Sequence, residues 1–169
     1  MNDGKMTALL SSYRPANSLA LSLFSMTEAV FPAEWNNEVS ELFVRDLVSF
    51  SVHARRLVQN TSLKNEQLIV ERPYHNPQYT RQVNWLDRFD FATNRIIHYV
   101  NLEVDYVETV QRQRFKGTTR NHAPFSVRVT TKDFPEKADI NVNGMALVFL
   151  TNIKPFLQSS FPALAGIKE

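Results

Sequence analysis

The chain has 169 residues, of which 43% are hydrophobic, enough for one globular domain that buries a core of its own. It contains no cysteine, which excludes disulfide frameworks, thiolate metal sites and thiol nucleophiles. The formal net charge is only +2, from 19 basic and 17 acidic residues, so bulk charge argues neither for nor against a polyanionic partner. We therefore expect a single domain over residues 1–169.

The N-terminal residues and the apolar runs of the sequence predict neither export nor membrane insertion. The first six residues lack the basic-then-apolar layout of a signal peptide. Apolar runs are short: the run from Met145 to Leu150 has six residues, whereas a membrane-spanning helix needs roughly 20. We expect a cytoplasmic protein with no membrane partner.

Hydrophobic periodicity predicts four helices. Pro15 precedes a first helix over about residues 17–31, with Asn17 or Ser18 as its N-cap. Pro32 ends it, because proline cannot continue the helical hydrogen bonds. The other three are expected over residues 37–60, 80–99 and 142–158.

A strand pattern separates the third and fourth of these helices. Val100, Leu102, Val104 and Tyr106 alternate with polar residues, and Phe125, Val127 and Val129 repeat the alternation further along. A continued helix over 100–110 is the alternative, because some of these residues also fit helical spacing. The strand is preferred, which gives an antiparallel β-hairpin over about residues 100–131. The expected fold class is α+β, mainly α: a helical bundle with a late hairpin and a C-terminal helix.

The end of the third helix holds the first candidate site. Asn94 and His98 are four residues apart and share one stripe of that helix, with Arg95 between them in sequence. An imidazole at a helix end can act as a general acid or base. It can equally be a helix-end residue bonded to local carbonyls.

The segment Asn94-Arg95-Ile96-Ile97-His98, late in a helical bundle and before a strand, resembles the HEPN-like superfamily. That resemblance implies a helical domain, in many members a metal-independent ribonuclease or a toxin or defence component, often acting as a homodimer. Active members place an arginine ahead of the histidine with four to six residues between. Here those positions hold Thr93, Ala92 and Phe91, so only His98 carries over and catalysis is in doubt.

Two further features are candidates. Asp46 and His53 lie two turns apart on the otherwise apolar stripe of the second helix, as a buried polar pair that is either a dyad or two satisfied core groups. The predicted hairpin carries a basic set suited to nucleic-acid phosphates, or simply to a solvated tip that discourages aggregation. Its members are Arg112, Arg114, Lys116 and Arg120.

Several motifs are absent from the sequence. It has no Gly-rich phosphate loop, no HExxH metal pair and no GxSxG elbow. We therefore expect no cofactor and no metal.

Three functions follow from these features. The first is a non-catalytic HEPN-like domain that binds RNA or a protein partner, in a toxin or defence setting. The second is a metal-independent ribonuclease that uses His98 with an arginine from elsewhere in the fold or from a second subunit. The third is a structural interaction module that forms an oligomer through its first two helices.

Overall fold

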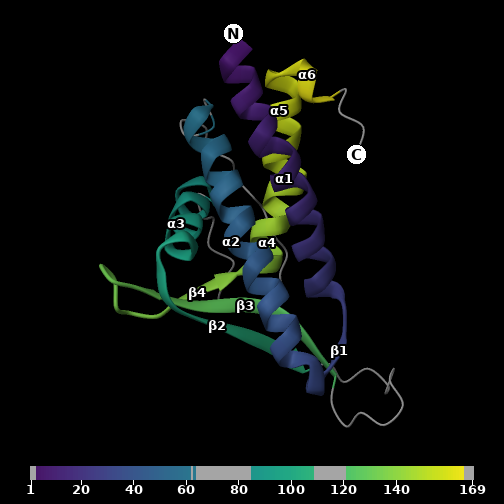
Figure 1. The fold of residues 1–169 in the computed structure, drawn as a ribbon, viewed down its shortest axis with the longest axis vertical. Helices are drawn as coiled ribbons and strands as arrows, with labels where there is room; N and C mark the ends of the chain where they lie inside the picture. Colours follow the sequence, from purple (N-terminus) through teal and green to yellow (C-terminus); the bar gives the residue numbers. More distant parts are fainter. Residues whose placement is uncertain (1–2, 62, 64–84, 109–120, 166–169) are drawn as a thin grey trace.

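The protein has an α+β fold dominated by helices. The computed structural model describes residues 3–61, 63, 85–108 and 121–165. Figure 1 shows the main helices running along the long axis of the molecule, with the sheet lying across their lower part. The start of α1 and the short helix α6 lie at the end opposite the sheet.

The elements follow one another in an order close to the predicted one. The α-helices are α1 (Asp3–Glu28), α2 (Asn36–Asn60), α3 (Trp85–Ile97), α4 (Val142–Val148), α5 (Lys154–Ser160) and α6 (Pro162–Ala165). The strands are β1 (Phe31–Pro32), β2 (Tyr99–Glu108), β3 (Asn121–Thr131) and β4 (Ala138–Asn141). A 3-10 turn η1 (Ala33–Trp35) precedes α2, and a π-helical turn η4 (Phe149–Ile153) joins α4 to α5.

The predicted start of the first helix was wrong. Pro15 lies inside α1, which begins at Asp3 and ends at Glu28. The buried stripe extends back through Leu9 and Tyr13, and its burial offsets the roughly 3 kcal/mol that an interior proline costs a helix. Asn17, predicted as a cap, is buried in mid-helix instead.

The second helix is confirmed almost to the residue, and the third in part. α2 carries its apolar stripe on one face from Val39 to Leu57. α3 ends at Ile97 rather than at residue 99, because Tyr99 already pairs with Thr131 as the first residue of β2. The expected start of this helix at residues 80–84 lies outside the described residues.

The antiparallel pairing of the predicted hairpin strands is confirmed. The segment after His98 is therefore a strand and not a continued helix. Leu102 faces Val129 and Val104 faces Val127 across the β2–β3 ladder. β3 is the central strand, since it pairs with β1, β2 and β4, and α1, α2, α3 and α4 all contact it. β1 and β4 were not predicted.

Strand β2 forms an edge of the sheet, because β3 is the only described strand that pairs with it. Register shifts interrupt the pairing between Tyr99 and Asn101 and again between Asp105 and Tyr106. Arg128 of β3 lies 2.7 Å from Asp105 and 3.6 Å from Glu103 of β2. These pairs tie the polar face of the edge strand to its neighbour.

The C-terminal helix follows the predicted path but contains a turn of a different kind. Asn141 caps it as expected, since its side chain accepts a hydrogen bond from the backbone N–H of Gly144 at 2.7 Å. Pro155 was expected to kink or stop the helix, yet α5 continues to Ser160. The π-helical turn η4 comes just before Pro155, where a wider turn accommodates a residue without a backbone N–H.

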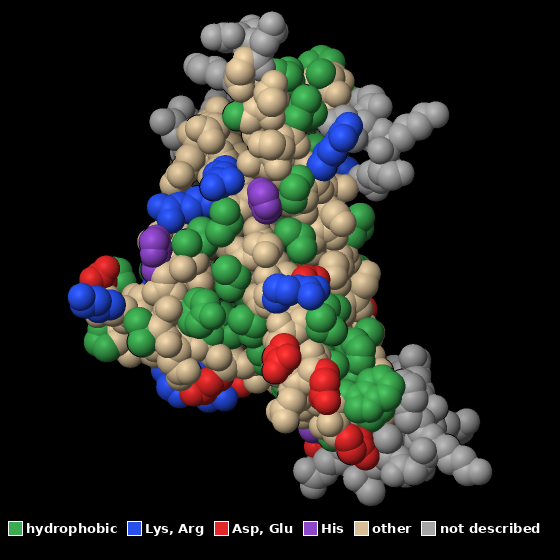
Figure 2. Space-filling view, viewed as in Figure 1, with side chains coloured by type: hydrophobic (Ala, Val, Ile, Leu, Met, Phe, Trp, Pro, Cys, Tyr) green, Lys and Arg blue, Asp and Glu red, His purple; other side chains and the backbone are tan. Residues whose placement is uncertain are grey.

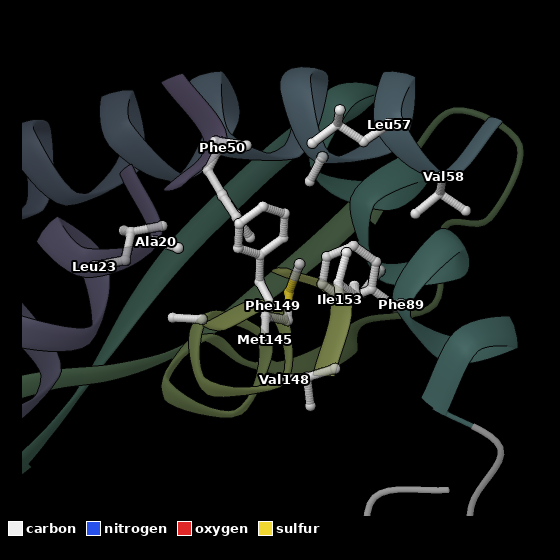
Figure 3. Close-up of a cluster of buried hydrophobic side chains, with 14 of the residues drawn as sticks. Ala20, Leu23, Phe50, Leu57, Val58, Phe89, Met145, Val148, Phe149 and Ile153 are labelled. Carbon is white, nitrogen blue, oxygen red and sulfur yellow. The ribbon is translucent and has the colours of Figure 1, made fainter. Parts of the chain in front are cut away.

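The hydrophobic core is centred on Phe50 of α2. Its ring meets Phe89 of α3 edge-on, with centroids 6.1 Å apart, and Phe149 of η4 edge-on at 5.4 Å. Figure 3 shows the Phe50 side chain pointing into the cluster of α2, α3 and C-terminal side chains. All three rings are almost completely buried, so one side chain joins three helical segments.

Among the described helices, none combines the length and the apolar character needed to cross a bilayer.

We predict that Phe50→Ala lowers the free energy of unfolding by about 3–5 kcal/mol, because it opens a cavity and removes both aromatic contacts. Urea denaturation followed by circular dichroism measures this loss. Leu42→Ala is the matched control, since Leu42 lies on the same helix but is 46% exposed, and it should change stability by less than about 0.5 kcal/mol. Equal losses in the two variants would contradict the central role of Phe50.

Candidate functional site

His98 lies at the surface between α3 and β2, with an arginine beside it. Nη1 of Arg55, on α2, is 3.4 Å from Nε2 of His98. The backbone N–H of His98 donates to the carbonyl of Asn94 at 3.1 Å, which closes the last turn of α3. The imidazole is exposed, so this guanidinium–imidazole pair is accessible to a ligand.

The geometry of this pair defines which form of the imidazole it favours. A guanidinium can only donate hydrogen bonds, so the Nε2 atom that faces it must accept. The contact therefore favours the tautomer with the proton on Nδ1 and the lone pair on Nε2. A negatively charged oxygen that enters between the two groups would accept hydrogen bonds from the guanidinium of Arg55.

Two more side chains extend this surface along α2. His53 and Arg56 are close enough for the charge of Arg56 to act on the imidazole. Burial, and after it the charge of Arg56, lower the pKa of His53 below its ordinary value of 6.5. We call His53, Arg55, Arg56 and His98 the basic band. Figure 2 shows Lys or Arg side chains gathered with His side chains over the upper part of α2 and beside α3.

The structure does not bring Asp46 and His53 together as a dyad, and the alternative of a polar group satisfied by hydrogen bonds holds for Asp46. Asp46 accepts hydrogen bonds from Ser22 of α1, at 2.9 Å, and from Arg45. Nδ1 of His53 is buried and has no hydrogen-bond partner among the described residues. Two turns of helix separate the two side chains by roughly 10 Å, so Asp46 joins α1 to α2 while His53 belongs to the basic band.

Arg95 also has a structural role rather than the predicted catalytic one. Its guanidinium carbon lies 4.8 Å from the ring centroid of Phe91 and 4.5 Å from that of Phe134. Its Nη1 donates to the backbone carbonyls of Phe134 and Glu136, each at 3.4 Å. We call Arg95, Phe91 and Phe134 the Arg95 clamp, because it fastens the β3–β4 connection to α3. Asn94, by contrast, is exposed.

The basic hairpin set lies outside the described residues. Arg112, Arg114, Lys116 and Arg120 all fall within 109–120, so the prediction that they contact nucleic acid remains a prediction.

A second polar cluster joins the start of α2 to the sheet. The hydroxyl of Tyr106 lies 2.7 Å from Ser40 Oγ and donates to the carbonyl of Asn36 at 2.7 Å. The Asn36 side chain in turn lies 3.0 Å from Nδ1 of His122. Burial raises the pKa of Tyr106, so the hydroxyl stays protonated and the cluster serves to connect α2, β2 and β3.

The described residues offer no metal centre. Within them, no group of three or more His, Asp or Glu side chains is placed to hold an ion.

Comparison with known protein families, with curated proteins and with solved structures finds no match to this chain. The HEPN-like resemblance therefore rests on residues 94–98.

We predict that Arg56→Gln raises the pKa of His53, because the substitution removes the repulsion between two positive charges. The pKa should stay below 6.5, since burial is the larger cause and persists. An NMR titration of the imidazole resonances measures the change. Arg45→Gln, on the same helix roughly 12 Å along its axis from His53, is the control and should leave the titration unchanged.

The same lowered pKa predicts how His53 links stability to pH. As the pH falls through 6.5, the unfolded chain binds a proton at this residue before the folded protein does. Folding stability from His53 is therefore present above 6.5 and decreases below it. A His53→Gln variant should lose this part of the pH dependence, and an unchanged pH profile would contradict it.

Proposed function

We propose that this protein is a HEPN-like domain that binds RNA through the basic band without cleaving it, in the toxin or defence setting that the resemblance implies. The observation that carries the proposal is the exposed contact between Arg55 and His98, extended along α2 by Arg56 and His53. Three of these side chains belong to α2, and His98 directly follows the last residue of α3.

The state of the arginines supports a polyanionic ligand. Neither Arg55 nor Arg56 forms an ion pair with a carboxylate among the described residues, whereas Arg45 and Arg128 do. A guanidinium that pairs with no carboxylate in the described part of the chain is available to a phosphate and releases counterions when it binds one. Arginine also recognises phosphate through two parallel hydrogen bonds.

We predict that Arg55→Ala weakens RNA binding about tenfold, the effect of losing roughly 1.4 kcal/mol from a charged hydrogen bond. The slope of log affinity against log salt should also fall by about 0.7, as expected when one phosphate contact to a single strand is lost. Fluorescence anisotropy with a labelled oligonucleotide at several salt concentrations measures both quantities.

The control for this experiment is Arg45→Ala. Arg45 is also an exposed arginine of α2, but Asp46 already pairs with it at 2.9 Å, so RNA affinity should not change. If the unmodified protein binds no RNA even at low salt, the proposal fails, and a structural interaction module becomes the remaining alternative.

A second function, metal-independent ribonuclease, is supported by one specific observation. Arg55 of α2, 3.4 Å from His98, could supply the arginine that is missing ahead of His98 in α3. Nε2 of His98 could take the proton from a ribose 2′-hydroxyl as that oxygen attacks the phosphorus. The bond to the 5′-oxygen then breaks, and the departing oxygen takes a proton from water. Arg55 would stabilise the charge on the phosphate oxygens.

If this second function holds, His98→Ala should abolish RNA cleavage by the purified protein. EDTA should have no effect, because the proton transfer uses protein groups and water alone. His122→Ala is the control, since His122 is bonded to Asn36 in the separate polar cluster, and it should retain activity. Equal turnover in the His98→Ala variant would eliminate the catalytic function and leave RNA binding in place.

A further inference from the structure

The Arg95 clamp leaves two large aromatic rings at the surface. Phe91 is 49% exposed and Phe134 is 54% exposed, although each has one face against the guanidinium of Arg95. Side chains that served only to anchor the β3–β4 connection would gain stability from being covered. The outer part of each ring is instead open to solvent.

Both rings are held in place rather than free to collapse. Arg95 is only 9% exposed, and it donates to two carbonyls of the connection that carries Phe134. Phe134 and Thr131 exchange backbone hydrogen bonds of 3.3 and 3.1 Å. An aromatic surface fixed before binding loses little conformational entropy when a ligand stacks on it.

The clamp continues directly into the basic band. Phe91 lies on α3 and His98 comes seven residues later, directly after the end of that helix, so they lie on nearly the same side of it about 10 Å apart along its axis. The ring of Phe134 is connected to His98 through the sheet. Tyr99, the residue after His98, pairs with Thr131, and Thr131 forms backbone hydrogen bonds with Phe134. Cations and exposed rings therefore succeed each other along one surface.

We propose that the Arg95 clamp is a base-stacking site and that the RNA bound by this protein is single-stranded. The inference rests on the proposed function and names its substrate class. Phosphates lie against Arg55 and Arg56, while an unstacked base lies on the exposed part of Phe91 or Phe134. Bases inside a duplex are already stacked and cannot reach such rings.

Exposed carboxylates adjoin both rings in the sequence. Asp90 precedes Phe91 and Asp133 precedes Phe134, and both are exposed, as is Lys132 beside Asp133. Carboxylates repel phosphate, but they accept hydrogen bonds from the amino groups of bases. The step from Arg55 and Arg56, which pair with no carboxylate among the described residues, to two exposed rings thus matches a nucleotide, with its charged phosphate and its uncharged base.

The test compares a single-stranded RNA with the duplex of the same sequence. Phe91→Leu and Phe134→Leu keep apolar packing on Arg95 but remove the flat π-face. Each should weaken single-strand binding about 5- to 150-fold, the range for loss of one stacked base, and leave duplex binding unchanged. Phe91→Tyr, the matched control, should retain single-strand affinity.

A second test cross-links the unmodified protein to the same single strand with ultraviolet light, so it does not depend on the folding of any variant. Rings with a purely structural role would give no cross-links. Cross-linked nucleotide should map to the peptides that contain Phe91 or Phe134. Cross-links found only elsewhere would overturn the proposal.

The two proposals fail in different ways. If the Leu variants bind single strands as tightly as the unmodified protein while Arg55→Ala does not, the stacking site is wrong and RNA binding through the basic band stands. That outcome would leave the rings as a contact for a protein partner. If the unmodified protein binds neither RNA, the proposed function itself fails.

Discussion

The edge-on packing of Phe50 against Phe89 and Phe149 determines where the helices lie. An edge-to-face contact fixes the relative position of two rings more narrowly than simple apolar burial does. Arg55 lies five residues after Phe50 on α2. His98 lies nine residues after Phe89, just past the end of α3. The position of α3 against α2 therefore brings this guanidinium and imidazole together. The candidate site depends on a core contact that no ligand would touch.

Much of the fold could be predicted because its strongest signals are local. The stripe of α2, the alternation of β2 and β3 and the Asn141 cap all follow from residues within a few positions of one another. The misses have a different origin. β1 and β4 contain two and four residues, too few for any periodicity, and they exist because β3 offers partners. Pro15 was misread because the packing that tolerates it is not visible in its neighbours.

The candidate site shows the same division between local and distant information. His98 was found because a helix-to-strand change is visible in the sequence. Arg55 was not, since it lies 43 residues earlier and only the packing of two helices brings it near. Arg95 was predicted to be catalytic because nothing in its local sequence shows that it is buried. Its burial depends on the segment around Phe134, 39 residues away. A signal was nevertheless available, because three of the last eight residues of α2 are His53, Arg55 and Arg56.

The edge position of β2 has a consequence for how molecules of this protein meet in solution. A flat ten-residue edge would offer its backbone groups to the same strand of another molecule, as growing fibrils do. The two register shifts bend this strand. In an antiparallel match of two such strands centred near Val104, Glu103 and Asp105 would oppose acidic groups of the other copy. Arg128 and Lys137 already pair with these carboxylates, so intermolecular growth of the sheet through this strand is disfavoured mainly by its shape.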